Sequence, residues 1–359
     1  MEKSKNSELL QTFLWTGGAL ILGLIVSFAF LPAVGEDPFA ALQLMVGMTF
    51  SDSFNMGKIL VKAAPLILCS LAFASTFKAN LFNIGAQGQF YMGCICATAI
   101  SLGCQDVLPP FLTILLAALG AMAGGAAIGY IIALLKTKFN ANEFLVSMMS
   151  TYVVLYIMKL LLRTSLQESK HEYVQSDMLS NAVWLPKFLP GTTASIGILI
   201  SVVAAIAIYF ILKKTTLGYR IQVTGLNMDA ARLSGIDPKK QFLIAFAISG
   251  CLAGLAGFIE VNGMQHMLLD GLDSDIGSYG IGIAIMANSN PIGVIFCSLL
   301  FGALQVGGTI LSHETTAPAS IIDLMLGIVM LFVLFSFFFR NRHEIKKTIK
   351  KQIALEGKK

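Results

Sequence analysis

Charged residues are scarce in this 359-residue chain, where only 13% of positions are Asp, Glu, Lys or Arg. Soluble domains carry about 25% charged residues, so about half of the expected water-facing complement is missing. Apolar residues instead make up 56% of the sequence, and the mean hydropathy is +0.76. This composition argues against a soluble enzyme, a nucleic-acid-binding protein and a disordered protein. The sequence predicts an all-α integral membrane protein.

Sequence motifs for chemistry are also missing. The chain has no G-x-x-x-x-G-K-[ST] phosphate loop, no H-E-x-x-H zinc motif and no G-x-S-x-G nucleophile elbow. Its six cysteines lack the spacing of metal sites, and all but Cys104 lie inside apolar runs, which favours packing roles. We therefore expect no catalytic residue, metal site or cofactor, and any ATP that drives this protein must be hydrolysed by another subunit.

Long apolar runs recur from end to end, and a helix needs about 20 residues to cross the hydrocarbon core. Ten runs predict about ten transmembrane helices in a single membrane domain over residues 1–359. Two of the runs are less typical, because one opens with amides (84–103) and one is short and polar (274–288), so the fallback count is eight to nine. The ten runs are 13–31, 59–77, 84–103, 111–135, 144–162, 194–212, 242–261, 274–288, 292–311 and 320–339.

Positive charge predicts the orientation of these helices, because Lys and Arg concentrate in cytoplasmic segments. With a cytoplasmic N-terminus, most of the 25 Lys and Arg residues fall inside and most acidic residues fall outside. An even number of spans then places both termini in the cytoplasm. The basic tail at 340–359 is predicted to lie against anionic membrane lipid.

The middle of every predicted span lacks Lys, Arg, Asp and Glu, and charged residues such as Lys62 and Glu260 are expected within a turn or two of a span end, where they can reach the membrane surface. Proton-coupled carriers usually keep an ionisable residue near the midplane, and ion channels show rings of charge or a carbonyl filter. A pathway lined by amides, hydroxyls and aromatic rings instead suits a neutral polar solute.

Two short motifs resemble each other across the chain. Residues 83–88 read N-I-G-A-Q-G at the start of the third run, and residues 275–280 read D-I-G-S-Y-G at the start of the eighth. Runs five apart cross the membrane in opposite directions, as in an inverted five-plus-five repeat, whose interrupted helices frame a substrate site near the midplane. The alternative is coincidence between glycine-rich helices. The candidate substrate pathway in and beside these motifs has amides that would hydrogen-bond a solute, at Asn83, Gln87 and Gln89. Phe90 or Tyr279 would stack on a solute ring, and Asp275 completes the candidates.

Small residues elsewhere are spaced for close helix packing, at Gly120, Gly124, Gly125 and Gly129 and again at Ser249, Ala253 and Gly257. The longest inner loop, 213–241, predicts one short helix at 227–235. Asn227 suits its N-cap, Gly235 ends it and Pro238 cannot continue it. A capped helix in a basic loop is suited to docking in a groove on another protein, and a solvated connector is the alternative.

Several blocks together resemble one family. Residues 82–89, F-N-I-G-A-Q-G-Q, look like the F-N-I-G-A-E-G-Q signature of permease subunits of bacterial nucleoside-type ABC importers, in the group that includes the ribose and branched-chain amino acid permeases. The resemblance continues at Asn142-Glu143 and within 218–236, 249–257 and 288–293. It implies a multi-pass pore subunit of a bacterial cell membrane with three partners. These are a cytoplasmic ABC ATPase seated under the 227–235 helix, a second permease chain and an extracytoplasmic substrate-binding lipoprotein.

The resemblance also implies roles for individual residues. It adds Asn142 and Glu143 to the candidate pathway, as contacts or as a gate. Gln87 departs from the Glu of the signature, and Ser150 and Thr151 stand where the family often has Asn, which would move the specificity from purine nucleosides toward a flavin or a sugar. The residues implied to couple the chain to the ATPase are Arg220, Asn227, Ala230, Ala231, Arg232 and Gly235.

Two other classes of function compete with this interpretation. A stand-alone secondary carrier would explain the spans and the repeated motif, but not the capped helix. A membrane-embedded enzyme or scaffold would need a catalytic cluster, and none is visible in the sequence.

Overall fold

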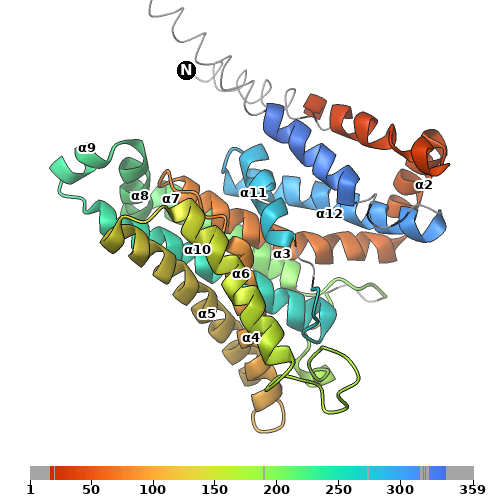
Figure 1. Cartoon of the computed structure of the whole chain (residues 1–359), viewed down its shortest axis with the longest axis horizontal. Helices are drawn as coiled ribbons and strands as arrows, with labels where there is room; N and C mark the ends of the chain where they lie inside the picture. Colours follow the sequence, from red (N-terminus) through yellow and green to blue (C-terminus); the bar gives the residue numbers. More distant parts are fainter. Residues whose placement is uncertain are drawn as a thin grey trace, which may run out of the picture. The chain divides into compact units, whose positions relative to one another are not determined.

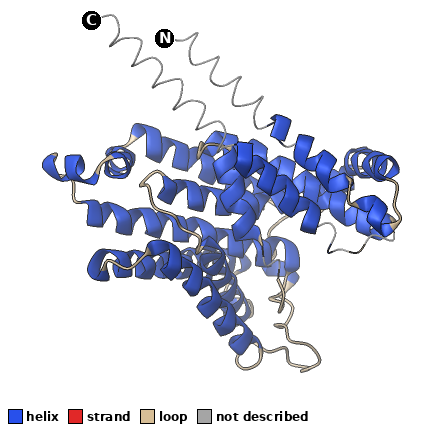
Figure 2. Ribbon diagram, turned by 45° about the horizontal axis from the view of Figure 1, so that its top comes forward, coloured by secondary structure: helices blue, strands red, loops and turns tan. Residues whose placement is uncertain are grey.

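The structure, a computed structural model, describes residues 17–19, 21–188, 191–272, 275–315, 318, 320 and 323–336. This part of the chain is helical and contains no strand, only isolated bridges between Gln175 and Leu269 and between Lys187 and Ser195 (Figure 2). The predicted all-α fold is confirmed. The chain divides into two compact units, one formed by 1–51 with 304–359 and one formed by 52–303. The basic tail 340–359 lies outside the described residues.

The unit 52–303 is a helical bundle around two buried helices, α3 and α10 (Figure 1). Helix α10 packs on α3, α4 and α5, while α11 packs on α3 and α6 on α4. The bounds of its helices are α3 Ser53–Phe77, α4 Ala86–Cys104, α5 Pro110–Phe139, α6 Glu143–Leu162, η2 Asn181–Val183, α7 Gly197–Lys214, α8 Thr216–Leu226, α9 Met228–Leu233, α10 Pro238–Glu260, the π-helix η3 Val261–Gln265, α11 Ile276–Met286 and α12 Pro291–Glu314, which continues into the other unit.

Glycines bring α5 and α10 into backbone contact. A Cβ atom on Gly125 would lie 2.2 Å from the carbonyl oxygen of Gly250, and one on Gly129 would lie 2.3 Å from that of Phe246. Two turns further along α10, a Cβ on Gly257 would lie 2.4 Å from the carbonyl oxygen of Phe90 in α4. No side chain fits at these distances, so the expected small-residue packing is confirmed.

The other unit has its own apolar core, which includes Phe28, Leu31, Met45, Leu311 and Met325. Its elements include η1 Leu31–Val34 and α2 Pro38–Ser51, which is followed after one residue by α3. Helix α2 is absent from the predicted set of spans, because its 14 residues fall short of the length that defines a span.

Within the part of the chain that the structure describes, six helices are long and apolar enough to cross a membrane, and each overlaps a predicted run. They are Ser53–Phe77, Pro110–Phe139, Glu143–Leu162, Gly197–Lys214, Pro238–Gln265 and Pro291–Glu314. Helix α4 also covers its predicted run but carries amides in its first turn. Helix α11 has only 11 residues, which is about 16 Å of helix against a hydrocarbon core of about 30 Å. The run 274–288 is therefore not a full helical crossing, and the total of ten stays a prediction.

Two charged residues differ from the expectation in different ways. Lys62 was expected near the end of a span, but α3 begins at Ser53, so Lys62 lies more than two turns inside the helix. Glu260 does lie near the end of its span, as the last residue of α10. It is completely buried, however, and its Oε1 accepts a hydrogen bond of 3.0 Å from Nε2 of Gln265.

Candidate functional site

A cluster of uncharged polar side chains lies inside the unit 52–303. Nδ2 of Asn83 donates to Oγ of Ser249 at 2.7 Å and to Oε1 of Gln89 at 3.0 Å. All three side chains are completely buried. Oδ1 of Asn83 and Nε2 of Gln89 have no hydrogen-bond partner among the described residues. The cluster therefore holds one buried acceptor and one buried donor whose hydrogen-bonding capacity is not used by the described residues.

The depth of this cluster follows from its position on α10. Ser249 lies about 16 Å along the helix axis from Pro238, at a rise of about 1.5 Å per residue. The candidate span runs on to Gln265, so the cluster lies near the middle of that span. Interrupted helices near the bilayer midplane are where permeases of known fold bind solutes.

Local sequence explains how Asn83 reaches this depth. Helix α3 ends at Phe77, and Asn80 adopts a left-handed conformation with φ 58°. The chain then enters α4 through Gly85, where a Cβ would lie 2.8 Å from the carbonyl oxygen of Ser147. Glycine is thus required for the loop to pass against α6 and deliver Asn83 to the core.

The two similar motifs meet at Gln87 and Gly277. The backbone N–H of Gly277, at the start of α11, donates to Oε1 of Gln87 in the first turn of α4. A Cβ on Gly277 would lie 2.7 Å from the backbone nitrogen of Gln87. The structure therefore brings these two predicted pathway segments together, although the internal symmetry of the repeat stays a prediction.

The other pathway candidates in these segments have different surroundings. Phe90 is completely buried, with its ring 5.8 Å from that of Tyr91. Asp275 precedes α11, is exposed and makes no side-chain cap. Tyr279 is half-buried one turn later. In this conformation Phe90 has no open face on which a solute ring can stack.

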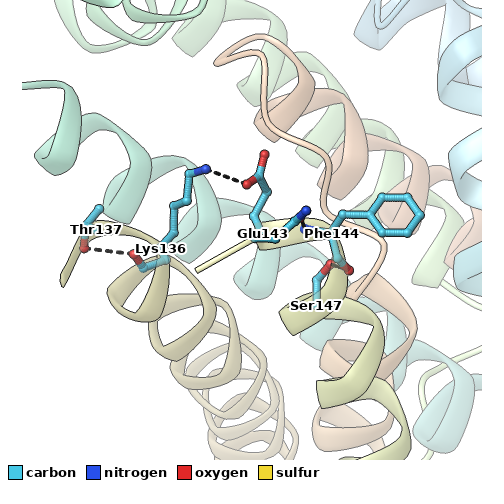
Figure 3. A network of polar contacts seen from close by, with 7 residues as sticks. Lys136, Thr137, Glu143, Phe144 and Ser147 are labelled. Carbon is cyan, nitrogen blue, oxygen red and sulfur yellow. Dashed lines mark hydrogen bonds and ion pairs between the residues drawn. The ribbon is translucent and has the colours of Figure 1, made fainter. Parts of the chain in front are cut away.

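Asn142 and Glu143 lie apart from the amide cluster, at the beginning of α6. Oδ1 of Asn142 caps the helix by accepting from the backbone N–H of Phe144 at 3.0 Å. Figure 3 shows Glu143 extending toward Lys136 of α5, and their charged groups are 2.7 Å apart. These contacts join the ends of α5 and α6, which is a packing role.

The predicted docking helix is present as α9, Met228–Leu233, at one end of the unit (Figure 1). Oδ1 of Asn227 caps it by accepting from the N–H groups of Asp229 and Ala230, and Gly235 ends it with φ 75°. Arg232 is exposed and 3.3 Å from Asp229.

The surroundings of α9 include features that the sequence did not indicate. Ala231 is completely buried within its own chain, so its side chain is not on the exposed surface. Helix α8, Thr216–Leu226, precedes α9 and was not predicted, and it carries the exposed candidate Arg220. Leu226 and Leu233 are 87% and 91% exposed. These two leucines are the last residues of α8 and α9.

The loop between α6 and α7 contacts η3 and His266, the residue that follows it. Leu185 donates its backbone N–H to the carbonyl of Asn262 at 2.8 Å, and Nδ2 of Asn262 bonds to Oγ of Ser101 at 3.0 Å. The rings of Trp184 and His266 stack with centroids 3.8 Å apart. These polar residues had no recognisable sequence motif, and Ser249 had been interpreted only as a small packing residue.

Among the residues that the structure describes, no group of three or more His, Cys, Asp and Glu side chains could hold a metal ion. Comparison with known proteins then identifies the class. The family model described as branched-chain amino acid transport system, permease component, matches residues 55–334. The chain belongs to this family of permeases. It is a multi-pass membrane protein and a pore-forming permease subunit of an ABC importer, consistent with its six candidate spans.

Three curated relatives show the range of this permease family. The nucleoside ABC transporter permease protein NupB of Lactococcus lactis is 28% identical over 95% of both chains. The glucose ABC transporter permease protein TsgB13 of Haloferax volcanii is 31% identical over 90% of this chain and 87% of its own length. The guanosine ABC transporter permease protein NupP of Bacillus subtilis is 27% identical over 90% of this chain and 93% of its own. These relatives are permease subunits rather than enzymes, and such subunits work with an ATPase and usually with a substrate-binding protein.

Proposed function

We propose that this permease imports a nucleoside or a related neutral polar solute. The observation that carries the proposal is the buried, uncharged cluster of Asn83, Gln89 and Ser249 near the middle of a candidate span. Its available acceptor and donor match the edge of a nucleobase or the hydroxyl groups of a sugar. The relatives named for nucleosides and guanosine support this substrate class.

A sugar is the second candidate, and one observation favours it. The relative named for glucose has the highest identity of the three, at 31%. Gln87 also offers an amide where the resembling signature has a carboxylate. Uptake of labelled guanosine and uptake of labelled glucose, measured separately in the same membranes, distinguish the two substrates. Uptake of glucose without uptake of guanosine would replace the nucleoside with a sugar in this proposal.

The proposed energy source is a separate cytoplasmic ATPase that binds the 227–235 segment. The capped helix α9 and the exposed Leu226 and Leu233 beside it support this docking. The proposed assembly also contains a second permease chain and an extracytoplasmic substrate-binding lipoprotein. It lies in a bacterial cell membrane, with both termini of this chain in the cytoplasm. We assign no catalytic activity to the chain itself.

The test is purification of the detergent-solubilised protein from its native membrane, with mass spectrometry of everything that co-purifies. The expected companions are an ATPase with a phosphate-binding loop, a second permease and a lipoprotein. A chain that purifies alone, and that transports solute in liposomes without ATP, would replace this proposal with a secondary carrier.

A further inference from the structure

The amide cluster joins two segments that both lead back to α9. Asn83 ends the loop that follows α3, and Ser249 belongs to α10, which begins three residues after Gly235. The 2.7 Å hydrogen bond between Asn83 and Ser249 therefore joins α10, which follows α9 in the chain, to the loop after α3. A second connection between α9 and Asn83 runs through α8.

Helix α8 makes that connection through one face. Gly218, Ile221 and Gly225 are spaced three and four residues apart and so lie on the same side of the helix. A Cβ on Gly218 would lie 2.2 Å from the carbonyl oxygen of Ile211 in α7. A Cβ on Gly225 would lie 2.4 Å from the carbonyl oxygen of Lys78 and 2.8 Å from the carbonyl carbon of Ala79. One end of α8 therefore lies directly against the backbone of α7, and the other end lies against the backbone of residues 78–79.

Apolar packing fills the middle of this face. Ile221 is 1% exposed and belongs to one buried cluster with Ala79, Leu81 and Phe246. Leu81 lies two residues before Asn83, and Phe246 lies one turn before Ser249 on α10. A single packed cluster therefore contacts α8 and both segments that hold the amide bond.

Close packing of this kind transmits displacement, because a dense interior has little room to absorb it. Helix α9 follows α8 after Asn227 alone, and the backbone N–H of Asn227 bonds to the carbonyl of Val223 at 3.1 Å. Because no flexible linker separates the two helices, we expect a displacement of α9 to displace α8 as well.

We infer that α8 is the lever that carries the motion of α9 to Asn83, and that Gly225 is its positioning residue against the 78–79 backbone. This inference rests on the proposed coupling of α9 to an ATPase. Motion delivered along α8 and along α10 would shift Asn83 and Ser249 relative to each other, and so change the cluster that holds the solute.

The test compares Gly225→Ala with wild type in proteoliposomes that contain the purified complex. ATP hydrolysis and solute uptake are measured together at saturating solute, and their ratio is the readout. The methyl group must displace the 78–79 backbone, and misplacement by about 1 Å costs up to about a hundredfold in enzymes. We expect Gly225→Ala to keep its partners and to hydrolyse ATP, but to transport about tenfold less solute per ATP.

Gly103→Ala is the matched control, because a Cβ at this helical glycine meets nothing within 4 Å. It should transport as much solute per ATP as wild type. An unchanged ratio in Gly225→Ala overturns the inference. If Gly225→Ala fails to insert, Ile221→Ala is measured instead, because it removes the α8 side chain buried in the cluster with Ala79, Leu81 and Phe246. Its ratio should also fall, and an unchanged ratio overturns the inference.

Measurements on the wild-type protein test the proposed function separately from the role of α8. A wild-type chain with no ATPase partner, or with uptake that ignores ATP, removes the proposed function and the lever with it. Normal ATP-driven uptake by wild type with an unchanged ratio in the variant removes the lever alone.

Discussion

Oε1 of Gln87 accepts a hydrogen bond from the backbone N–H of Gly277, so the first turns of α4 and α11 are joined across 190 residues of sequence. Both turns belong to the similar motifs at 83–88 and 275–280. Helix α11 is only 11 residues long, and its N-terminus adjoins a buried amide. The predicted inverted repeat would place a solute site at such a meeting of two motifs, because transporters built from inverted repeats bind solutes where interrupted helices meet.

The amides of the pathway should determine affinity for the solute. Replacing Asn83 and Gln87 together with alanine removes the groups proposed to bind it, and each hydrogen bond contributes about 0.5–1.5 kcal/mol. We expect uptake by Asn83→Ala/Gln87→Ala to show an apparent affinity reduced by about tenfold. Concentration-dependent uptake measures this. Gln43→Ala, an exposed amide on α2, is the control, and wild-type affinity in a correctly inserted double variant would contradict the assignment.

Charge reversal on α9 should uncouple the permease from its ATPase. The Arg232 side chain is 59% exposed, so Arg232→Glu changes the docking surface without disturbing the core. We expect uptake to be lost while the protein stays in the membrane. Lys170→Glu, an exposed reversal in the α6–α7 loop, should transport normally. Full uptake and full stimulation of ATP hydrolysis by Arg232→Glu would remove this role from α9.

Ala231→Trp is a less specific test of the same docking. Since Ala231 is completely buried, a Trp side chain would overpack its own chain, which typically costs about 1–3 kcal/mol. We expect this variant to lower the melting temperature of the detergent-solubilised protein as well as uptake. A variant that lost uptake at an unchanged melting temperature would indicate that position 231 does contact the partner.

The ion pair of Lys136 and Glu143 should contribute to stability rather than to transport. Their side chains are 23% and 17% exposed and the charged atoms are 2.7 Å apart. Lys136→Ala, Glu143→Ala and the double variant form a mutant cycle, for which we expect a coupling of about 0.5–1 kcal/mol in reversible unfolding. A fall in apparent solute affinity in Glu143→Gln, at unchanged stability, would instead show that Glu143 contacts the solute.

The α6–α7 loop should loosen in acid. The hydrogen bond from the Gln175 side chain, helped by the backbone N–H groups of Tyr173 and Glu172, holds the pKa of Glu168 below its ordinary value. A carboxyl group with a lowered pKa stabilises the folded loop above its unfolded pKa of about 4.3, and this contribution is lost as pH falls through the folded pKa. Hydrogen exchange of residues 168–175, corrected for intrinsic rates, should therefore accelerate below about pH 4.

Two variants test the assignment of this acid effect. Glu168→Gln should weaken the protection of the loop already at neutral pH, because it removes the charged acceptor. Glu172→Gln, which changes an exposed carboxyl group in the same loop, should keep the wild-type protection. Equal protection in wild type and Glu168→Gln at every pH would show that another group orders the loop.

The sequence by itself determined the features that depend on local pattern. Composition and run length determined the all-α membrane fold and six of the spans, because hydrophobic length is sufficient to define a membrane helix. The cap at Asn227 and the stop at Gly235 determined α9, because capping depends on neighbouring residues alone. The spacing of small residues likewise indicated close helix packing at 120–129 and at 249–257, but not which helices pack together.

Only the tertiary structure decided which polar groups meet. Asn83 and Ser249 are 166 residues apart, and Gln87 and Gly277 are 190 apart, so no local pattern links them. Helix α8 contains two glycines, which are poor helix formers, and its packing on α7 and on the 78–79 backbone sustains it. The complete burial of Glu260 was also decided there, because it depends on the helices packed around α10 and not on the local sequence.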